Sequence, residues 1–172
     1  MSTLRERLRQ SSLLRSVSGP FVSTGPRRRT RMSQPVSSPA AFPVSIKGVV
    51  VRDGRVLLLH NERDEWELPG GRIELGETPE SCVAREITEE TRWKVRTGPI
   101  LDAWMYYIAV ADKNVFIVTY GCHPEGDDDP IVSHEHNDIG LFTEHEVADL
   151  SMPEGYKRSI ATWFTMLVDR NG

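Results

Sequence analysis

The chain has 172 residues, of which 38% are hydrophobic and 27% charged, and its formal net charge is −4. This composition is ordinary for a globular domain with a core of its own. No apolar run reaches the roughly 20 residues that a membrane-spanning helix needs, and Cys82 and Cys122 form neither a CxxC pair nor a disulfide framework. We therefore expect a protein of a reducing, cytoplasmic setting with no membrane partner.

The charge is distributed unevenly along the chain. Residues 1–31 contain eight arginines and one acid, a net charge of +7, so the rest of the chain carries −11. An acidic body argues against duplex nucleic acid as a partner, because phosphate binding requires clustered Lys and Arg. Residues 1–42 are rich in Ser, Arg and Pro, which predicts a disordered leader; a transit peptide and an over-extended start before Met32 both stay open. Residues 43–172 are expected to form one domain.

The domain is predicted to begin with a β-hairpin. Residues 45–60, SIKGVVVRDGRVLLLH, contain two β-rich runs on either side of Asp53-Gly54, a pair that suits a tight primed turn. The polar loop NERDEW and the segment ELPGG follow. Beyond Trp93, the runs ILDAWMYYIAV and NVFIVTYGC predict two further strands that turn at residues 111–114.

The C-terminal part is predicted to contain a loop, a strand and two helices. Residues 123–138, HPEGDDDPIVSHEHND, predict a long polar loop, and IGLFT a short strand. A brief helix is expected at residues 144–150, and a longer amphipathic helix opens at Pro153 and closes at Asn171-Gly172. Strands and helices in this mixed order predict an α/β or α+β sandwich with helices outside the sheet.

A helix that precedes the long strands carries three glutamates on one face. It starts at Thr78-Pro79-Glu80, which supply a hydroxyl N-cap, a proline at the first position and an acid in the first turn. A narrow apolar stripe for packing is formed by Val83, Ala84 and Ile87. The three glutamates, Glu86, Glu89 and Glu90, lie off this stripe and destabilise the helix by mutual repulsion. A divalent cation with a preference for oxygen ligands would relieve it, whereas a bare ExxEE is also compatible with a solvated helix face.

The wider pattern resembles the box of the Nudix hydrolases. It runs from Gly71 through five residues to Glu77, then through seven residues to Arg85-Glu86-Ile87 and, after one more residue, Glu89-Glu90. The run WELPGGRIE enters it as is common in this family, and SHEHNDIGLFTEHEVADL is similar to the family's later loop, strand and helix. The resemblance covers residues 44–168 and leaves the leader outside.

The chain departs from the box at Arg92, where the family has glycine, and at Trp93, where it has an aliphatic residue. The box glycine lies just past the helix, where a positive φ commonly caps the last carbonyls. Either Arg92 adopts a left-handed conformation or the helix runs one residue further. Neither residue is a metal ligand, so the departure concerns local geometry more than chemistry.

The resemblance implies a mixed β-sheet sandwich between helices, with the box as a loop–helix–loop. It also implies water attack on phosphorus and cleavage of a pyrophosphate linkage, with Mg²⁺ or Mn²⁺ as the cofactor and a nucleotide as the substrate. Glu86 and Glu90 would be the main metal ligands, and Glu89 a further ligand or a base acting on bound water. The Gly70 carbonyl would be one more ligand. The residues that would orient the carboxylates are Arg85 and Glu77.

Further candidates lie outside the box helix. Glu135 stands where many relatives have another acid in a loop near the metals and would be a metal ligand or general base, with Asp138 as its rival and a solvated loop charge as the alternative. Arg72 follows the double glycine and is predicted to contact a substrate phosphate. The aromatic residues that could stack on a base or ribose include Trp66 and Phe142, together with Trp104, Tyr106 and Tyr107. Alternation along the strand places Trp104 and Tyr106 on one face and leaves open which face lines a pocket.

The substrate itself stays open between a modified nucleoside triphosphate and a nucleotide sugar. Tyr107-Ile108-Ala109 lacks the proline and the well-placed tyrosine found in relatives that act on ADP-ribose, dinucleoside polyphosphates, NADH or coenzyme A. The alternative function is a non-catalytic Nudix-like module that senses nucleotides. Such modules usually lose box glutamates, and this chain keeps them all. Homodimer formation stays open as well.

Overall fold

A computed structural model of the chain describes residues 40–134 and 136–171. The elements are, in chain order, β1 (Val44–Arg52), β2 (Arg55–His60), β3 (Trp66–Glu67), β4 (Gly70–Arg72), α1 (Pro79–Thr91), β5 (Lys94–Ile108), the 3-10 helix η1 (Ala109–Ala111), β6 (Lys113–Glu125), β7 (Asp138–Phe142), α2 (Glu144–Asp149) and α3 (Glu154–Asn171). The predicted leader up to residue 39 lies outside the described residues. None of the helices in the described part is long and apolar enough to cross a membrane.

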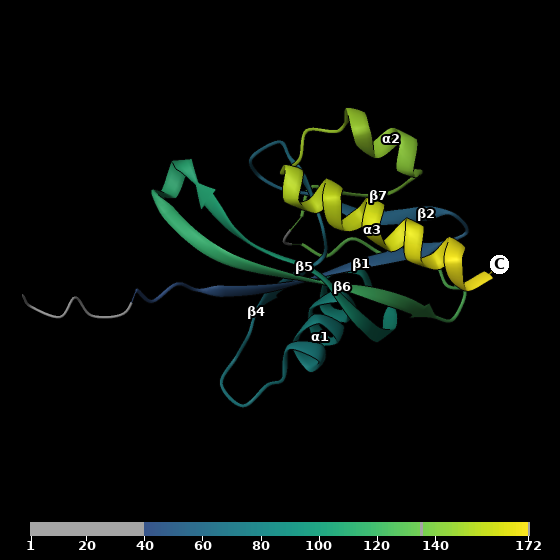
Figure 1. The fold of residues 1–172 in the computed structure, drawn as a ribbon, viewed down its shortest axis with the longest axis horizontal. Coiled ribbons are helices and arrows are strands. Elements are labelled where there is room, and N and C mark those ends of the chain that lie inside the picture. Colours follow the sequence, from purple (N-terminus) through teal and green to yellow (C-terminus); the bar gives the residue numbers. More distant parts are fainter. Residues whose placement is uncertain (1–39, 135, 172) are drawn as a thin grey trace, which may run out of the picture. The chain divides into compact units, whose positions relative to one another are not determined.

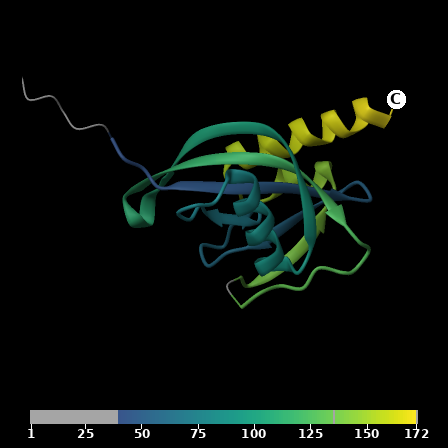
Figure 2. The ribbon, with the colours of Figure 1, turned by 90° about the horizontal axis from the view of Figure 1, so that it is seen from below.

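The strands form a mixed sheet in the order β3-β2-β1-β6-β5, with β4 beside β1 and β7 beside β2. β1 and β6 run parallel, whereas β5 and β6 form a long antiparallel hairpin. Helix α1 lies on one side of the sheet, and α2 and α3 lie on the other (Figure 1), an arrangement that the view from below also shows (Figure 2). The predicted mixed sheet between helices is therefore confirmed.

Both faces of β1 and β2 are covered, which explains their unbroken apolar runs. Val49 and Leu58 point to the core on the α3 side, where Tyr156, Ile160 and Trp163 pack. The residues that point to the core on the α1 side include Ile46, Val50, Leu57, Val83 and Ile87. Alternate strand residues thus supply two separate hydrophobic cores.

The predicted hairpin is confirmed, with Asp53 at φ 53° and Gly54 at φ 71°. Two positive φ values in succession are the mark of a type I′ turn, whose twist matches that of the flanking strands. Strand β6 is longer than predicted, because residues 123–125, expected in a loop, pair with residues 94–96 of β5. A distant partner strand, which local sequence cannot reveal, extends the ladder.

Helix α1 begins and ends with caps of different kinds. At its start the Thr78 Oγ1 atom accepts the Ser81 N–H at 3.2 Å and the Ser81 Oγ atom accepts the Thr78 N–H at 3.0 Å, a capping box. At its end Arg92 has φ 65° and donates its N–H to the Thr88 carbonyl at 3.0 Å. Of the two conformations considered for Arg92, the left-handed one is observed.

The loop between β6 and β7 completes the C-terminal end of α1. The N–H of Ile131 donates to the Thr91 carbonyl at 2.9 Å, and the N–H of Ser133 donates to the Glu90 carbonyl at 3.0 Å. Both carbonyls are among the last four of α1, which have no N–H partner within the helix. The loop is therefore attached to the helix end that carries the glutamates.

Candidate active site

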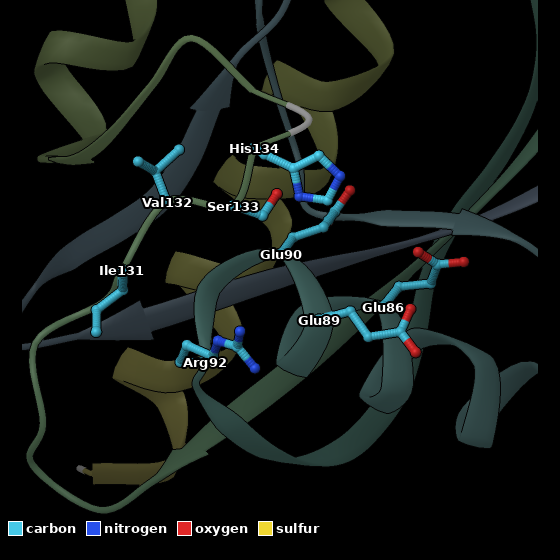
Figure 3. Close-up of a pocket in the computed structure, with 8 residues that line it drawn as sticks. All are labelled: Glu86, Glu89, Glu90, Arg92, Ile131, Val132, Ser133 and His134. Carbon is cyan, nitrogen blue, oxygen red and sulfur yellow. The ribbon is translucent and has the colours of Figure 1, made fainter.

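Glu86, Glu89 and Glu90 of α1 line one cavity of about 450 Å³, and in Figure 3 Glu86 and Glu89 lie beside each other while Glu90 lies beside His134. The exposed fraction of their side chains is 17% for Glu86, 59% for Glu89 and 8% for Glu90. The rest of the cavity is lined by Arg92, Ile131, Val132, Ser133 and His134. The attached loop thus supplies the part of the cavity lining that does not come from α1. The helical spacing predicted that the three glutamates share one face of the helix.

Arg85 connects the carboxylates to one another. Its Nε and Nη2 atoms donate to the two oxygens of Glu77 at 2.6 Å and 3.1 Å. Its Nη1 atom donates to Glu86 Oε1 and to Glu89 Oε2, both at 3.0 Å. Hydrogen bonding to Arg85 lowers the pKa of Glu77 to about 2. A single guanidinium therefore orients three carboxylates that would otherwise repel one another.

The double glycine of β4 allows the helix carboxylates to reach the backbone. Gly70 has φ +129° and donates its N–H to Glu90 Oε2 at 2.7 Å. A Cβ atom at Gly70 would overlap the Ile46 carbonyl oxygen, and a Cβ atom at Gly71 would overlap the carboxylate of Glu86. A side chain at position 70 would thus separate β4 from β1, and one at position 71 would displace the carboxylate of Glu86.

Two residues that the sequence did not single out, the buried Lys47 and the half-buried Glu67, extend the cluster. Lys47 Nζ donates to the Gly70 carbonyl at 2.5 Å and lies 3.8 Å from Glu67 Oε2. His136 Nε2 lies 3.5 Å from Glu67 Oε1 and 3.7 Å from Glu90 Oε1. A charged residue within the apolar run of β1 was the available signal for Lys47. The Gly70 carbonyl, predicted as a metal ligand, accepts a lysine ammonium here.

The pKa values of Glu67 and Glu90 follow from these neighbours. Burial raises the pKa of Glu90 above its ordinary value, although Lys47 and the Gly70 N–H counteract part of the effect. Burial also acts to raise the pKa of Glu67, but Lys47, His136 and Arg63 outweigh it and lower this pKa to about 2. The positive charges near Glu90 of α1 therefore do not outweigh its burial, whereas those near Glu67 of β3 do.

A second cavity, of about 190 Å³, lies beside β1 and β4 and carries mainly positive charge. Lys47, Arg63 and Arg72 line it, with Glu67 as the acid among its lining residues. Arg72, predicted to contact phosphate, is thus next to the glycines that support the glutamates. Tyr106 also lines this cavity, so the face of β5 that packs on the core contributes to it, while Met105 and Tyr107 are exposed.

Other predicted residues lie apart from these cavities. Trp66 and Phe142 pack edge to face, with their ring centroids 4.6 Å apart, and both contact the core on the α3 side. Neither lines the cavity of the glutamates or that of Arg72. Asp138, at the start of β7, accepts the N–H of Ile139 at 2.8 Å. Glu135 lies outside the described residues, so its predicted role stays a prediction.

The donor set fits a hard divalent cation by its chemistry. Glu86, Glu89 and Glu90 offer only carboxylate oxygens, the ligands that Mg²⁺ prefers. Within residues 40–134 and 136–171 no three acidic, His or Cys side chains lie close enough together to hold a metal ion. In this arrangement Arg85 Nη1 bonds both Glu86 and Glu89. A cation would therefore replace that contact, while Arg85 keeps its two bonds to Glu77.

Known proteins resemble this chain across the described region. The family model of the NUDIX domain matches residues 42–164. A MutT-like protein of Streptomyces ambofaciens is 37% identical over 122 residues, which cover 69% of this chain and 76% of that protein. The putative ADP-ribose pyrophosphatase YjhB of Bacillus subtilis (strain 168) is 28% identical over 128 residues, which cover 72% of this chain and 59% of YjhB.

A solved structure supports the fold. The binary complex of a C. elegans Ap4A hydrolase superposes with a TM-score of 0.65 over 74% of this chain and 98% of that one. Its sequence identity is 17%, so this likeness concerns the arrangement of strands and helices alone.

Proposed function

The chain belongs to the Nudix family, and from this premise we propose that it hydrolyses a pyrophosphate bond in a nucleotide with the help of Mg²⁺ or Mn²⁺. The observation that carries the proposal is that Glu86, Glu89 and Glu90, all from one face of α1, line the same cavity. Arg85 orients two of these carboxylates, and the Gly70 N–H fixes the third. The substrate is either a nucleoside diphosphate linked to another moiety or a nucleoside triphosphate.

A divalent cation bound here would neutralise charge on the phosphate oxygens and acidify the attacking water. Glu86 and Glu90, the two less exposed carboxylates, would hold it. Glu89, 59% exposed, is accessible to a water molecule and would accept its proton. The water oxygen bonds to phosphorus while the bond from phosphorus to the bridging oxygen breaks, and the leaving phosphate keeps the electron pair.

The cationic cavity supports a phosphate-bearing substrate. Lys47, Arg63 and Arg72 would attract the negative charge that every such nucleotide carries. With about 190 Å³ this cavity is smaller than the roughly 300–1,000 Å³ of pockets that enclose whole ligands. It would therefore bind one part of the substrate, and the remainder would lie beside the three glutamates of α1. The names of the relatives, an ADP-ribose pyrophosphatase and an Ap4A hydrolase, fit this chemistry, because both compounds contain a phosphoric anhydride.

A nucleotide screen tests the proposal. Full-length protein is incubated with nucleoside triphosphates, nucleotide sugars and dinucleoside polyphosphates, with Mg²⁺, with Mn²⁺ and with a chelator. We expect a nucleoside monophosphate to be released from at least one compound, and only when metal is present. Binding without product would instead support the nucleotide-sensing module. Turnover in the presence of chelator would contradict the metal dependence.

A further inference from the structure

Lys47 is a buried cation that the proposed chemistry leaves without a role at the reacting atoms. It lies in β1 directly opposite Gly70 of β4, and its side chain is 9% exposed. The ammonium donates to the Gly70 carbonyl at 2.5 Å, and Glu67 Oε2 is 3.8 Å away. A buried charge is costly unless it is paired, so this placement requires the acids around it.

The contact between Lys47 and Gly70 follows from the packing of β4 on β1. A Cβ atom at Gly70 would lie 2.9 Å from the Lys47 Cα atom, so only glycine allows the two strands to approach this closely here. Ser45, two residues earlier on the same face of β1, donates its hydroxyl to the Gly71 carbonyl at 3.2 Å. The carbonyls of both glycines are thus bonded by side chains of β1.

We propose that the Lys47 ammonium takes the place of a divalent cation at the Gly70 carbonyl, so that the cation of this enzyme is held by the carboxylates of α1 without this carbonyl. Mg²⁺ would lie about 2.0–2.1 Å from a carbonyl ligand, so two positive ions on one oxygen would be only a few ångströms apart. Such ions repel strongly where water is excluded. Lys47 is then a positioning residue, and this inference rests on the proposed function.

The test measures Mn²⁺ binding and needs no turnover. Full-length wild type, Lys47→Met and Lys47→Arg are titrated with Mn²⁺ by calorimetry, and free Mn²⁺ is counted by electron paramagnetic resonance. We expect Lys47→Met to bind Mn²⁺ at least tenfold more tightly or to bind one ion more, because the carbonyl becomes available. Lys47→Arg keeps the charge and should bind as wild type does. The matched control is Lys113→Met, at the tip of the β5–β6 hairpin. Unchanged affinity and stoichiometry in Lys47→Met would overturn the inference.

Three further variants keep the test decisive. Lys47→Met removes one of the positive charges beside Glu67, so the double variant Lys47→Met with Glu67→Gln is compared with Glu67→Gln alone, and the same gain in Mn²⁺ binding is expected. Equal binding by these two variants would overturn the inference even where the single variant fails to fold. Glu86→Gln, as a single substitution, should weaken Mn²⁺ binding relative to wild type. If it does and Lys47→Met has no effect, only this inference fails; if Glu86→Gln changes nothing, the proposed metal site fails.

Discussion

The half-buried Glu67 and the buried Glu90 each place a carboxylate oxygen close to the Nε2 atom of His136, at 3.5 Å and 3.7 Å. Their pKa values are nevertheless shifted in opposite directions. Glu67 lies near Lys47 and Arg63, and its pKa falls to about 2 against the effect of burial. Burial raises the pKa of Glu90, and the nearby charge of Glu86 adds to the rise.

This difference distinguishes Glu67, on the side of β1 and β3, from Glu90, on the side of α1. Beside Glu67 the chain itself supplies the positive charges of Lys47 and Arg63. On the side of α1, the guanidinium of Arg85 donates to Glu86 and Glu89, whereas Glu90 accepts from the neutral Gly70 N–H. A divalent cation would add positive charge beside the carboxylates of α1. This is the physical reason for placing the metal of the proposed function there.

The largest effect is expected from removing charge on the α1 side. Glu86→Gln and Glu90→Gln should each lower kcat by more than the roughly 10–100-fold that loss of an outer partner of a metal ligand costs. Mg²⁺ should raise the melting temperature of wild type by linkage, and the rise should shrink in Glu86→Gln. Steady-state kinetics and thermal melts check both. Glu80→Gln, on the same helix but outside the cavity, is the control. Near-normal kcat in both site variants would show that the site assignment is wrong.

A smaller effect, on stability and not on turnover, is expected from replacing Glu67 on the side of β1 and β3. A carboxyl group whose pKa falls from 4.5 to about 2 on folding stabilises the protein above its unfolded pKa. This contribution, roughly 3 kcal/mol, is lost as pH falls from about 5 to about 2. The difference in unfolding free energy between wild type and Glu67→Gln should therefore narrow over this range in denaturant melts. A difference independent of pH would contradict the charge pairing of Glu67, and exposed Glu62→Gln should follow wild type.

The smallest effect is expected at Arg92, two residues from Glu90. Its φ of 65° costs a residue with a Cβ atom roughly 1 kcal/mol relative to glycine. Glycine also gains entropy in the unfolded chain, so Arg92→Gly should change the free energy of unfolding by about 1 kcal/mol or less. The hydrogen bonds that fix Glu90 and Glu86 involve Gly70 and Arg85, so kcat should stay within a few-fold of wild type. A denaturant melt with kinetics measures both. A hundredfold gain in kcat would mean that the natural chain is an impaired enzyme.

The sequence predicted those parts of the fold and site that depend on neighbours along the chain. The type I′ turn at Asp53-Gly54 follows from the residues of the turn itself. The start of α1 at Thr78 and the common face of its glutamates follow from helical spacing. Pattern similarity to the Nudix box then predicted the mixed sheet between helices.

Contacts between distant segments were decided only by the tertiary structure. Trp66 and Phe142, considered for substrate stacking, pack on each other because β3 and β7 both pair with β2. Lys47 meets the Gly70 carbonyl because β4 folds back onto β1, 23 residues away in the chain. His136 comes close to both Glu67 and Glu90 because its loop is attached to the end of α1. Residue types and local spacing determine which carboxylates share a helix face, whereas strand pairing determines which charges surround them.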